Sequence, residues 1–156
     1  MGQEYFSVAL SSNVNLAIPL NSMGAVIQVE AQNICLIPGV ADFWHGTINF
    51  KGSLLWVLDS DRYFKLDNTS GYFNKYTAVV IQQDRSQSSK KIALVAKKLL
   101  GIVALNSENS AQLAGDSSVL EQCCSSINQE ETKRIFILNP SNLFERLYQN
   151  STLVSA

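Results

Sequence analysis

The fold is decided by the stretch His45-Gly46-Thr47-Ile48-Asn49-Phe50-Lys51-Gly52-Ser53-Leu54-Leu55-Trp56-Val57-Leu58-Asp59. It predicts two adjoining strands that meet at a turn at Gly52. Alternation along the first strand puts on one side Trp44, Ile48 and Phe50, and on the other His45, Thr47, Asn49 and Lys51. The first side suits a hydrophobic core, and the second can meet a partner. The second strand, residues 54–58, is apolar at every position, which predicts cover on both sides.

The stretch contains, in order, Gly46, Asn49, Lys51-Gly52 and Val57-Leu58-Asp59. These pieces resemble the central signature of the CheW-like family, the adaptor domain of bacterial chemotaxis. In that family a hydrophobic residue and Gly lead into Asn-hydrophobic-Arg-Gly. A second strand then runs to a hydrophobic-Asp-Leu ending.

Three positions depart from the family pattern. Ser60 follows Asp59 where Leu is usual, and Trp56 takes a position often held by Pro. Lys51 stands for the usual Arg, so a planar fork that can hold a carboxylate at two points becomes a flexible point charge. Trp56 beside the Asp59 strand end resembles versions from cyanobacterial gliding and pilus-motility pathways, which favours pilus motility or phototaxis over flagellar switching as the output.

Length and composition describe one globular domain. The chain has 156 residues, of which 46% are hydrophobic and 16% charged. A net charge of −1 and a pI near 5.8 give no general attraction for phosphate backbones, so nucleic acid is not an expected partner. No signal-peptide pattern and no apolar run of about 20 residues is present. We therefore expect a cytoplasmic protein without direct membrane insertion, associated at most with membrane receptor arrays.

Turn-forming residues divide the rest of the chain into short segments. We expect strands at residues 5–10, 16–20, 34–37, 76–82, 92–96, 100–105 and 134–138, and helical turns at 23–29 and 59–64. We expect a loop between the two halves of the fold at 67–71 and a tight connector at 84–89. Residues 106–132 are rich in Ser, Asn and Gln, which predicts an irregular, partly mobile segment or a short helix. Many short strands with little helix favour barrels or a sandwich.

The last predicted element is a helix. Asn139 suits its N-cap, and Pro140 suits its first position. One stripe of this helix then carries Leu143, Phe144, Leu147 and Tyr148. A helix with such a stripe should dock on the body of the domain.

The sequence offers little for catalysis. His45 is the only histidine, and no Gly-framed serine, reactive-cysteine signature, phosphate-binding loop or metal-ligand spacing is present. The odd cysteine count indicates a reducing compartment, with Cys123-Cys124 read as two thiols in preference to a vicinal bridge or a metal site. Asp59 and Asp61 fit a strand end and a helix cap better than a catalytic dyad. We therefore expect no enzyme activity, no cofactor and no metal.

The aromatic and polar residues of the signature leave alternatives open. Trp44 and Phe50 suit a core but could be interface anchors. Trp56 suits a surface rim or a subdomain seam. Asn49 and Lys51 fit a solvated strand face on pattern alone, and His45 fits a surface or rim position. The resemblance moves Asn49 and Lys51 toward partner binding.

The resemblance extends from Tyr5 to about Tyr148, so we expect a single CheW-like domain over residues 1–156 with an ordered core at about 5–148. It implies a mainly β fold. Two SH3-like five-stranded β-barrel subdomains would surround a shared core, with short helices and a C-terminal helix. The segment 106–132 lacks the usual Gly and Pro landmarks, which makes the second barrel the less certain half.

The resemblance also implies a function. Family members couple methyl-accepting chemoreceptors to a CheA-type histidine kinase, binding the receptor tip beside the signature strands and the regulatory domain of the kinase elsewhere. On this basis the residues expected to bind or support the receptor are Asn49, Lys51, Gly52 and Trp56. Those expected to contact the kinase, from a first helix, are Val26, Ile27 and Gln28.

Two other functions remain open. One is a generic SH3-like or sandwich module with another binding partner. The other is a small enzyme with an unrecognised site, which an apolar pocket lined by His45, Asp59 and a Ser hydroxyl would support.

Overall fold

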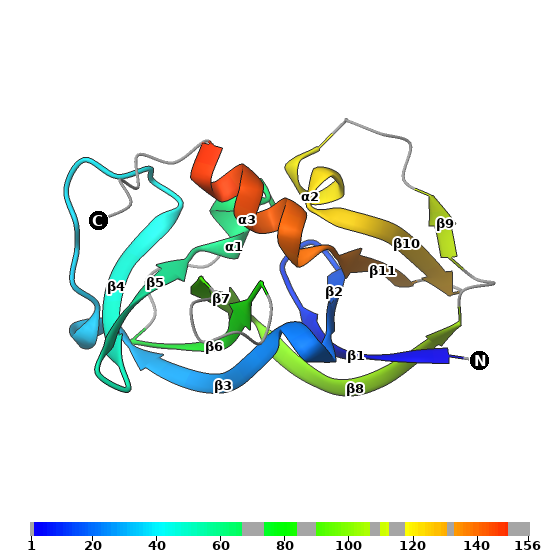
Figure 1. Ribbon diagram of the computed structural model, residues 1–156, viewed down its shortest axis with the longest axis horizontal. Coiled ribbons are helices and arrows are strands. Elements are labelled where there is room, and N and C mark those ends of the chain that lie inside the picture. The colour runs from blue at the N-terminus through cyan, green and yellow to red at the C-terminus, as the bar shows by residue number, and fades with distance from the viewer. Residues whose placement is uncertain are drawn as a thin grey trace.

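The computed structural model describes residues 2–66, 74–83, 90–106, 110–112, 118–130 and 133–149. Within them the fold is mainly β, as predicted (Figure 1). The first seven strands are β1 (Gly2–Ala9), β2 (Val14–Pro19), β3 (Met23–Glu30), β4 (Trp44–Phe50), β5 (Ser53–Leu58), β6 (Lys75–Gln82) and β7 (Lys91–Ala96). The others are β8 (Lys98–Asn106), β9 (Ser110–Gln112), β10 (Cys124–Glu130) and β11 (Lys133–Leu138). The helices are α1 (Ser60–Tyr63), α2 (Val119–Gln122) and α3 (Pro140–Gln149), with 3-10 turns η1 (Leu20–Ser22) and η2 (Ala31–Asn33).

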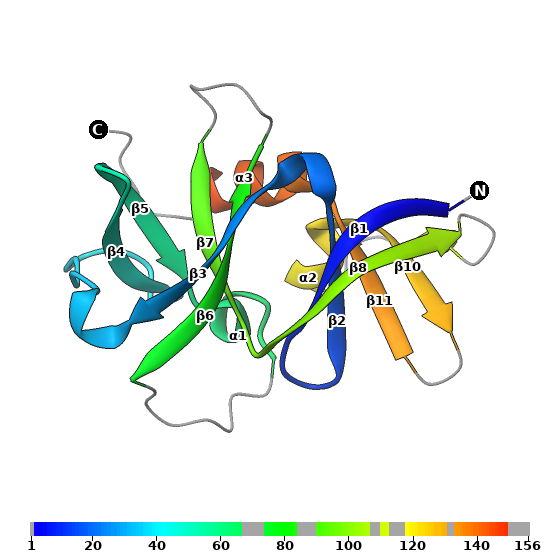
Figure 2. The same ribbon diagram turned by 90° about the horizontal axis from the view of Figure 1, so that it is seen from below.

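The strands form two sheets, which Figure 2 shows as separate curled units. The five-stranded sheet has the order β3-β6-β7-β5-β4 and uses one continuous part of the chain. The six-stranded sheet has the order β8-β1-β2-β11-β10-β9 and joins the two ends of the chain, with β2 parallel to β11 and β1 antiparallel to β8. Its sixth member, β9, is a three-residue edge strand added to the expected five.

Three hydrophobic clusters fill the fold. One lies inside the five-stranded sheet and contains Leu55, Val57 and Val80. Another lies inside the six-stranded sheet and contains Ala17, Ile135 and Ile137. The largest cluster takes residues from the other faces of both sheets and from all three helices. Each sheet therefore has buried apolar residues on both faces, which confirms the predicted pair of barrels around a shared core.

Helix α3 closes the shared core, crossing over the junction of the two sheets in Figure 1. Its predicted N-cap is confirmed, because Asn139 Oδ1 accepts a hydrogen bond of 3.2 Å from the N–H of Asn142. Leu143, Phe144 and Leu147 are fully buried on the predicted stripe. Burial of each such side chain stabilises the fold by roughly 1.5–3 kcal/mol.

Two predicted elements in the first half of the chain are wrong. Residues 23–29 form strand β3 and not a helical turn, because Val26, Ile27 and Val29 are β-branched and alternate between the two faces while β3 pairs with β6. Residues 34–37 form no strand. Only Cys35 pairs there, in an isolated bridge with Thr47, and the next residue, Leu36, points into solvent.

The second half also differs from expectation. Within residues 106–132 the expected short helix is α2, but Cys124–Glu130 forms strand β10, paired with β11. The polar residues Ser125, Ser126 and Asn128 do not give the apolar pattern of a strand. Pairing with β9 and β11 nevertheless holds this segment in the sheet. The expected loop at 67–71 does not separate the barrels, since β5 and β6 on either side of it belong to one sheet. That loop and the connector at 84–89 lie outside the described residues.

Gly46 fixes the position of β4 against the bridge to Cys35. Its φ of +138° is a conformation that side chains rarely allow, and a Cβ there would lie 2.7 Å from Ile34 Cγ2 and closer still to the carbonyl oxygen of Cys35. Only glycine at position 46 therefore allows Ile34 and Cys35 to lie so close to β4.

We predict that Gly46→Ala lowers the free energy of unfolding by more than about 2 kcal/mol, since backbone strain and a steric clash add together. Gly52→Ala is the matched control, because Gly52 has a φ of +81° but open space around its Cα. It should cost only about 1 kcal/mol. Urea unfolding measures both, and equal losses would contradict the proposed close contact.

Candidate partner-binding surfaces

The turn between β4 and β5 is built by the signature residues. Lys51 and Gly52 have φ values of +51° and +81°, the pattern of a two-residue turn that matches the twist of a β-hairpin. The Oδ1 atom of Asn49 accepts a hydrogen bond of 3.0 Å from the N–H of Gly52. Asn49 therefore has a structural task in this turn, in addition to any contact with a partner.

A β-bulge at His45 changes which side chains share a face. Trp44 pairs with Leu58 and Gly46 with Val57, so His45 is an extra residue. Ile48 and Phe50 consequently face the inside of the barrel, whereas Trp44 faces the shared core. The prediction that placed Trp44 with Ile48 and Phe50 is wrong for this reason, although Trp44 is a core residue as expected.

The predicted open side of β4 is partly covered. Thr47 is buried, and its N–H and C=O both bond to Cys35, at 2.9 and 2.7 Å. Asn49 and Lys51 remain exposed. The Lys51 Nζ atom lies 5.3 Å from the centre of the Phe50 ring, at the end of the hairpin.

The exposed residues at the hairpin end form one candidate site. Leu54 is 69% exposed, so the expected cover on both sides of β5 fails at its first apolar position. Trp56 is half-buried, with its ring 5.4 Å from that of Trp44, and thus lies at the rim of the shared core. We call the following residues the hairpin surface: Asn49, Lys51, Gly52, Leu54 and Trp56.

A second candidate site lies on β3 and β8, which run along the same lower side of Figure 1, one in each sheet. Val26, Leu100 and Ile102 are 40%, 41% and 60% exposed. We call these residues, with the exposed Gln28, the underside surface. Each barrel contributes to it at the edge of the shared core, because Val26 pairs with the core residue Val79 and Ile102 pairs with Phe6.

The three residues predicted to contact a kinase do not all lie on the same face of β3. Val26 and Gln28 point outward, but Ile27 faces the inside of the barrel and packs against its cluster. Sequence reasoning missed Leu100 and Ile102. The one sequence signal for these two residues was the run of apolar residues on both faces of β8. This run does not show which face the core covers.

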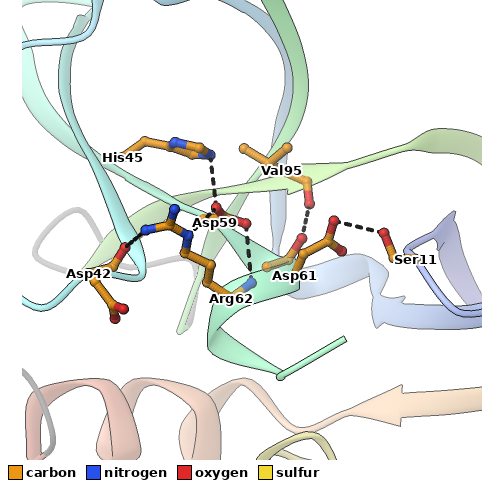
Figure 3. Close-up of polar contacts among 8 residues, drawn as sticks. Ser11, Asp42, His45, Asp59, Asp61, Arg62 and Val95 are labelled. Atoms are coloured by element: carbon orange, nitrogen blue, oxygen red, sulfur yellow. Dashed lines mark hydrogen bonds and ion pairs between the residues drawn. The ribbon is translucent and has the colours of Figure 1, made fainter. Parts of the chain in front are cut away.

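Asp59 joins the hairpin to α1 (Figure 3). It caps the helix, since its Oδ1 atom accepts a 3.2 Å hydrogen bond from the N–H of Arg62. Its Oδ2 atom lies 3.7 Å from both His45 Nε2 and Arg62 Nε. Its N–H donates to the carbonyl of Phe43 at 2.8 Å, and Arg62 Nη1 donates to the carbonyl of Asp42 at 3.3 Å.

The serine hydroxyl groups near this cluster already donate hydrogen bonds. Ser60 Oγ donates to the carbonyl of Val95, and Ser11 Oγ donates to Asp61 Oδ2 at 2.7 Å (Figure 3). The three cysteines are free thiols: Cys35 is exposed, Cys123 and Cys124 are buried, and burial raises the pKa of Cys123 to about 11. Asp59 and Asp61 thus act as a helix cap and a hydrogen-bond acceptor, in agreement with the reading preferred from sequence.

The described residues contain neither a cluster of metal-ligating side chains nor a membrane-spanning helix. No group of three or more His, Cys, Asp or Glu side chains there could hold a metal ion. No helix among them is both long and apolar enough to cross a bilayer.

We predict that Asp59→Ala lowers the free energy of unfolding by about 1–2 kcal/mol, because it removes the cap of α1 and the carboxylate between His45 and Arg62. Asp42→Ala is the control, since Asp42 binds Arg62 through its main chain and the variant keeps that contact. It should cost less than about 0.5 kcal/mol. Chemical denaturation at pH 7.5 compares them, and similar losses would contradict the assigned role of Asp59.

His45 should make stability depend on pH. Burial lowers its pKa from the usual 6.5, with Asp59 opposing this effect and Arg62 adding to it. The unfolded chain therefore takes up a proton more readily than the folded chain. The resulting stability is present in full above pH 6.5 and is lost as the pH falls through the folded-state pKa.

The measurement is the free energy of unfolding of wild type and His45→Gln between about pH 5.5 and 7.5. Wild type should lose stability relative to the variant as the pH falls, because glutamine does not titrate. Parallel curves would show that His45 has the same pKa in both states.

Comparisons with known proteins agree with the two-barrel fold. A solved structure similar to this chain is the scaffolding protein TtCheW from Thermoanaerobacter tengcongensis, with a TM-score of 0.69, 15% identity, and coverage of 88% of this chain and 89% of that chain. The curated proteins contain no match. The family model described as CheW-like domain matches residues 4–147. Since this match spans most of the sequence, the chain belongs to the CheW-like domain family.

Proposed function

We propose that this protein couples methyl-accepting chemoreceptors to a CheA-type histidine kinase in a chemotaxis-like signalling array. As a CheW-like protein the chain is a non-catalytic scaffold and not an enzyme. The finer assignment of partners rests on the family and on the two exposed surfaces. In this proposal the array lies in the cytoplasm, beside the membrane receptors.

The observation that carries the proposal is the hairpin surface. Leu54 and Lys51 lie exposed at the end of a hairpin that needs neither of them for its core. An exposed apolar side chain next to a charge is suited to a partner surface with an apolar centre and an acidic rim. We assign this surface to the receptor. Lys51 would supply a single charge contact at the position where the family usually has arginine, which can bind a carboxylate through two hydrogen bonds.

The underside surface supplies a second contact. We assign Val26 and Gln28 on β3 to the kinase, and add Leu100 and Ile102, which the structure leaves exposed. Ile27 supports this surface from inside the barrel and would not touch the partner. Two separate surfaces allow one adaptor to hold two proteins at once.

The mechanism needs no bond to form or break. A change in the receptor alters kinase activity only if the complex binds the two states of the receptor with different free energies. Each contact can be weak, because many linked adaptors in an array give a high effective concentration.

We predict that Lys51→Ala weakens binding to the cytoplasmic fragment of a receptor by about three- to tenfold, and that Leu54→Glu weakens it by more than tenfold. Lys51→Ala removes a charge, and Leu54→Glu places one in the apolar centre. Both residues are exposed, so circular dichroism should show an intact fold. Binding to the isolated regulatory domain of the kinase should not change.

Two controls match these changes in charge. Lys91→Ala removes an exposed lysine from β7, and Ser141→Glu adds an acidic residue on the exposed face of α3. Neither should affect receptor binding. Ile102→Glu should weaken kinase binding alone. If the hairpin variants affect only the kinase, the two assignments are reversed; if the wild type binds neither protein, the chain is a scaffold for other partners.

A further inference from the structure

His45 occupies an unusual position for a residue next to a binding surface. It is the bulged residue of β4, and the centre of its ring lies 4.7 Å from the centre of the Tyr76 ring on β6. Its Nε2 atom is 3.7 Å from Asp59 Oδ2, and Arg62 Nε lies at the same distance from that same oxygen. Figure 3 shows both side chains converging on this carboxylate.

The cluster holds the start of β4 in place. Arg62 binds the carbonyl of Asp42, and the N–H of Asp59 binds the carbonyl of Phe43, so both residues that precede β4 are held against α1 and the end of β5. The bulge at His45 then decides that Asn49 lies on the exposed side of the hairpin. A disturbance at His45 therefore reaches the hairpin surface through the strand on which both lie.

We propose that His45 is a proton-linked positioning residue, whose protonation loosens the start of β4 and weakens partner binding at the hairpin surface. That protonation of His45 loosens β4 follows from the geometry of the Asp59 cluster. That this weakens binding of a partner rests on the proposed function. His45 is thus not a contact residue but one that acts through β4.

The physical cause is competition for one carboxylate oxygen. Among the described residues, the charged groups that act on His45 are Asp59 and Arg62, and the group packed on its ring is the phenol of Tyr76. A protonated imidazole places a second cation beside Asp59 Oδ2, which Arg62 already approaches. Burial makes this charge costly, which agrees with the lowered pKa of His45. Arg62, whose side chain is 55% exposed, is the cation free to move away, and its movement would release the carbonyl of Asp42 that precedes β4.

The first test needs no partner. Because His45 is the only histidine, its imidazole signals in an NMR titration are assigned without further variants. The backbone amides of Thr47 and Asn49 should shift with the same midpoint as the imidazole, below pH 6.5. These shifts should vanish in His45→Gln. An imidazole that titrates while both amides stay fixed would overturn the proposal.

Arg62→Ala provides a readout that a purely structural role would not give. Removing the cation that opposes protonation should raise the titration midpoint of His45, because Arg62 lowers its pKa in the wild type. An unchanged or lower midpoint would contradict competition for the Asp59 oxygen. This test does not depend on the stability of a His45 variant.

The second test adds the receptor fragment. Wild-type affinity should fall by up to about threefold between pH 7.5 and 5.5, because threefold is the limit that half a pKa unit between free and bound states allows. His45→Gln should keep a nearly constant affinity over this range. Equal pH dependence in the two proteins would overturn the link to binding. If wild type fails to bind at pH 7.5, the proposed function fails, and the NMR titration still decides the role of His45.

Discussion

The structure depends on one constraint, which is that both faces of each sheet carry apolar side chains that must be buried. One face of each sheet surrounds its own small cluster, and the other contributes to the core that the two barrels share. The six-stranded sheet meets this constraint only by joining strands from both ends of the chain. Helix α3 then covers the shared core with three fully buried side chains. Neither barrel has a complete core without the other, so the two barrels form one folded unit.

This constraint also explains where the candidate binding surfaces lie. Residues at the rim of the shared core are attached to a rigid base, yet their outer atoms have no cover. Trp56 and Val26 are of this kind, one near the hairpin and the other on β3. Side chains in such positions lose little further entropy on binding, which favours affinity at a small interface. The Asp59 cluster adds a polar link between the hairpin and the helix beneath it.

The elements that sequence alone predicted are those with local signals. The hairpin was marked by Lys51-Gly52, α1 by its Asp59 cap, and α3 by Asn139-Pro140. These features need only a few neighbouring residues to form. The same holds for the buried stripe of α3, because a helix repeats its face within the chain.

The errors concern features that depend on distant residues. The apolar run 23–29 fits a helix or a strand, and its pairing with β6 decides for a strand. Strand β10 is too polar to be recognised without its neighbours. The bulge at His45 exists only in the register between two strands, so the faces of Trp44 and Ile48 could not be assigned correctly from alternation. The exposure of Ile102 depends likewise on which face of β8 the core covers.

In the proposed function, one molecule holds a receptor and a kinase together through separate surfaces. Sedimentation of the purified chain with a receptor cytoplasmic fragment and a kinase regulatory domain tests it most directly. We expect a complex that contains all three proteins, at concentrations where the receptor fragment and the kinase domain alone do not associate. If either partner instead displaces the other from this chain, the two proteins share one surface, which contradicts the proposed function.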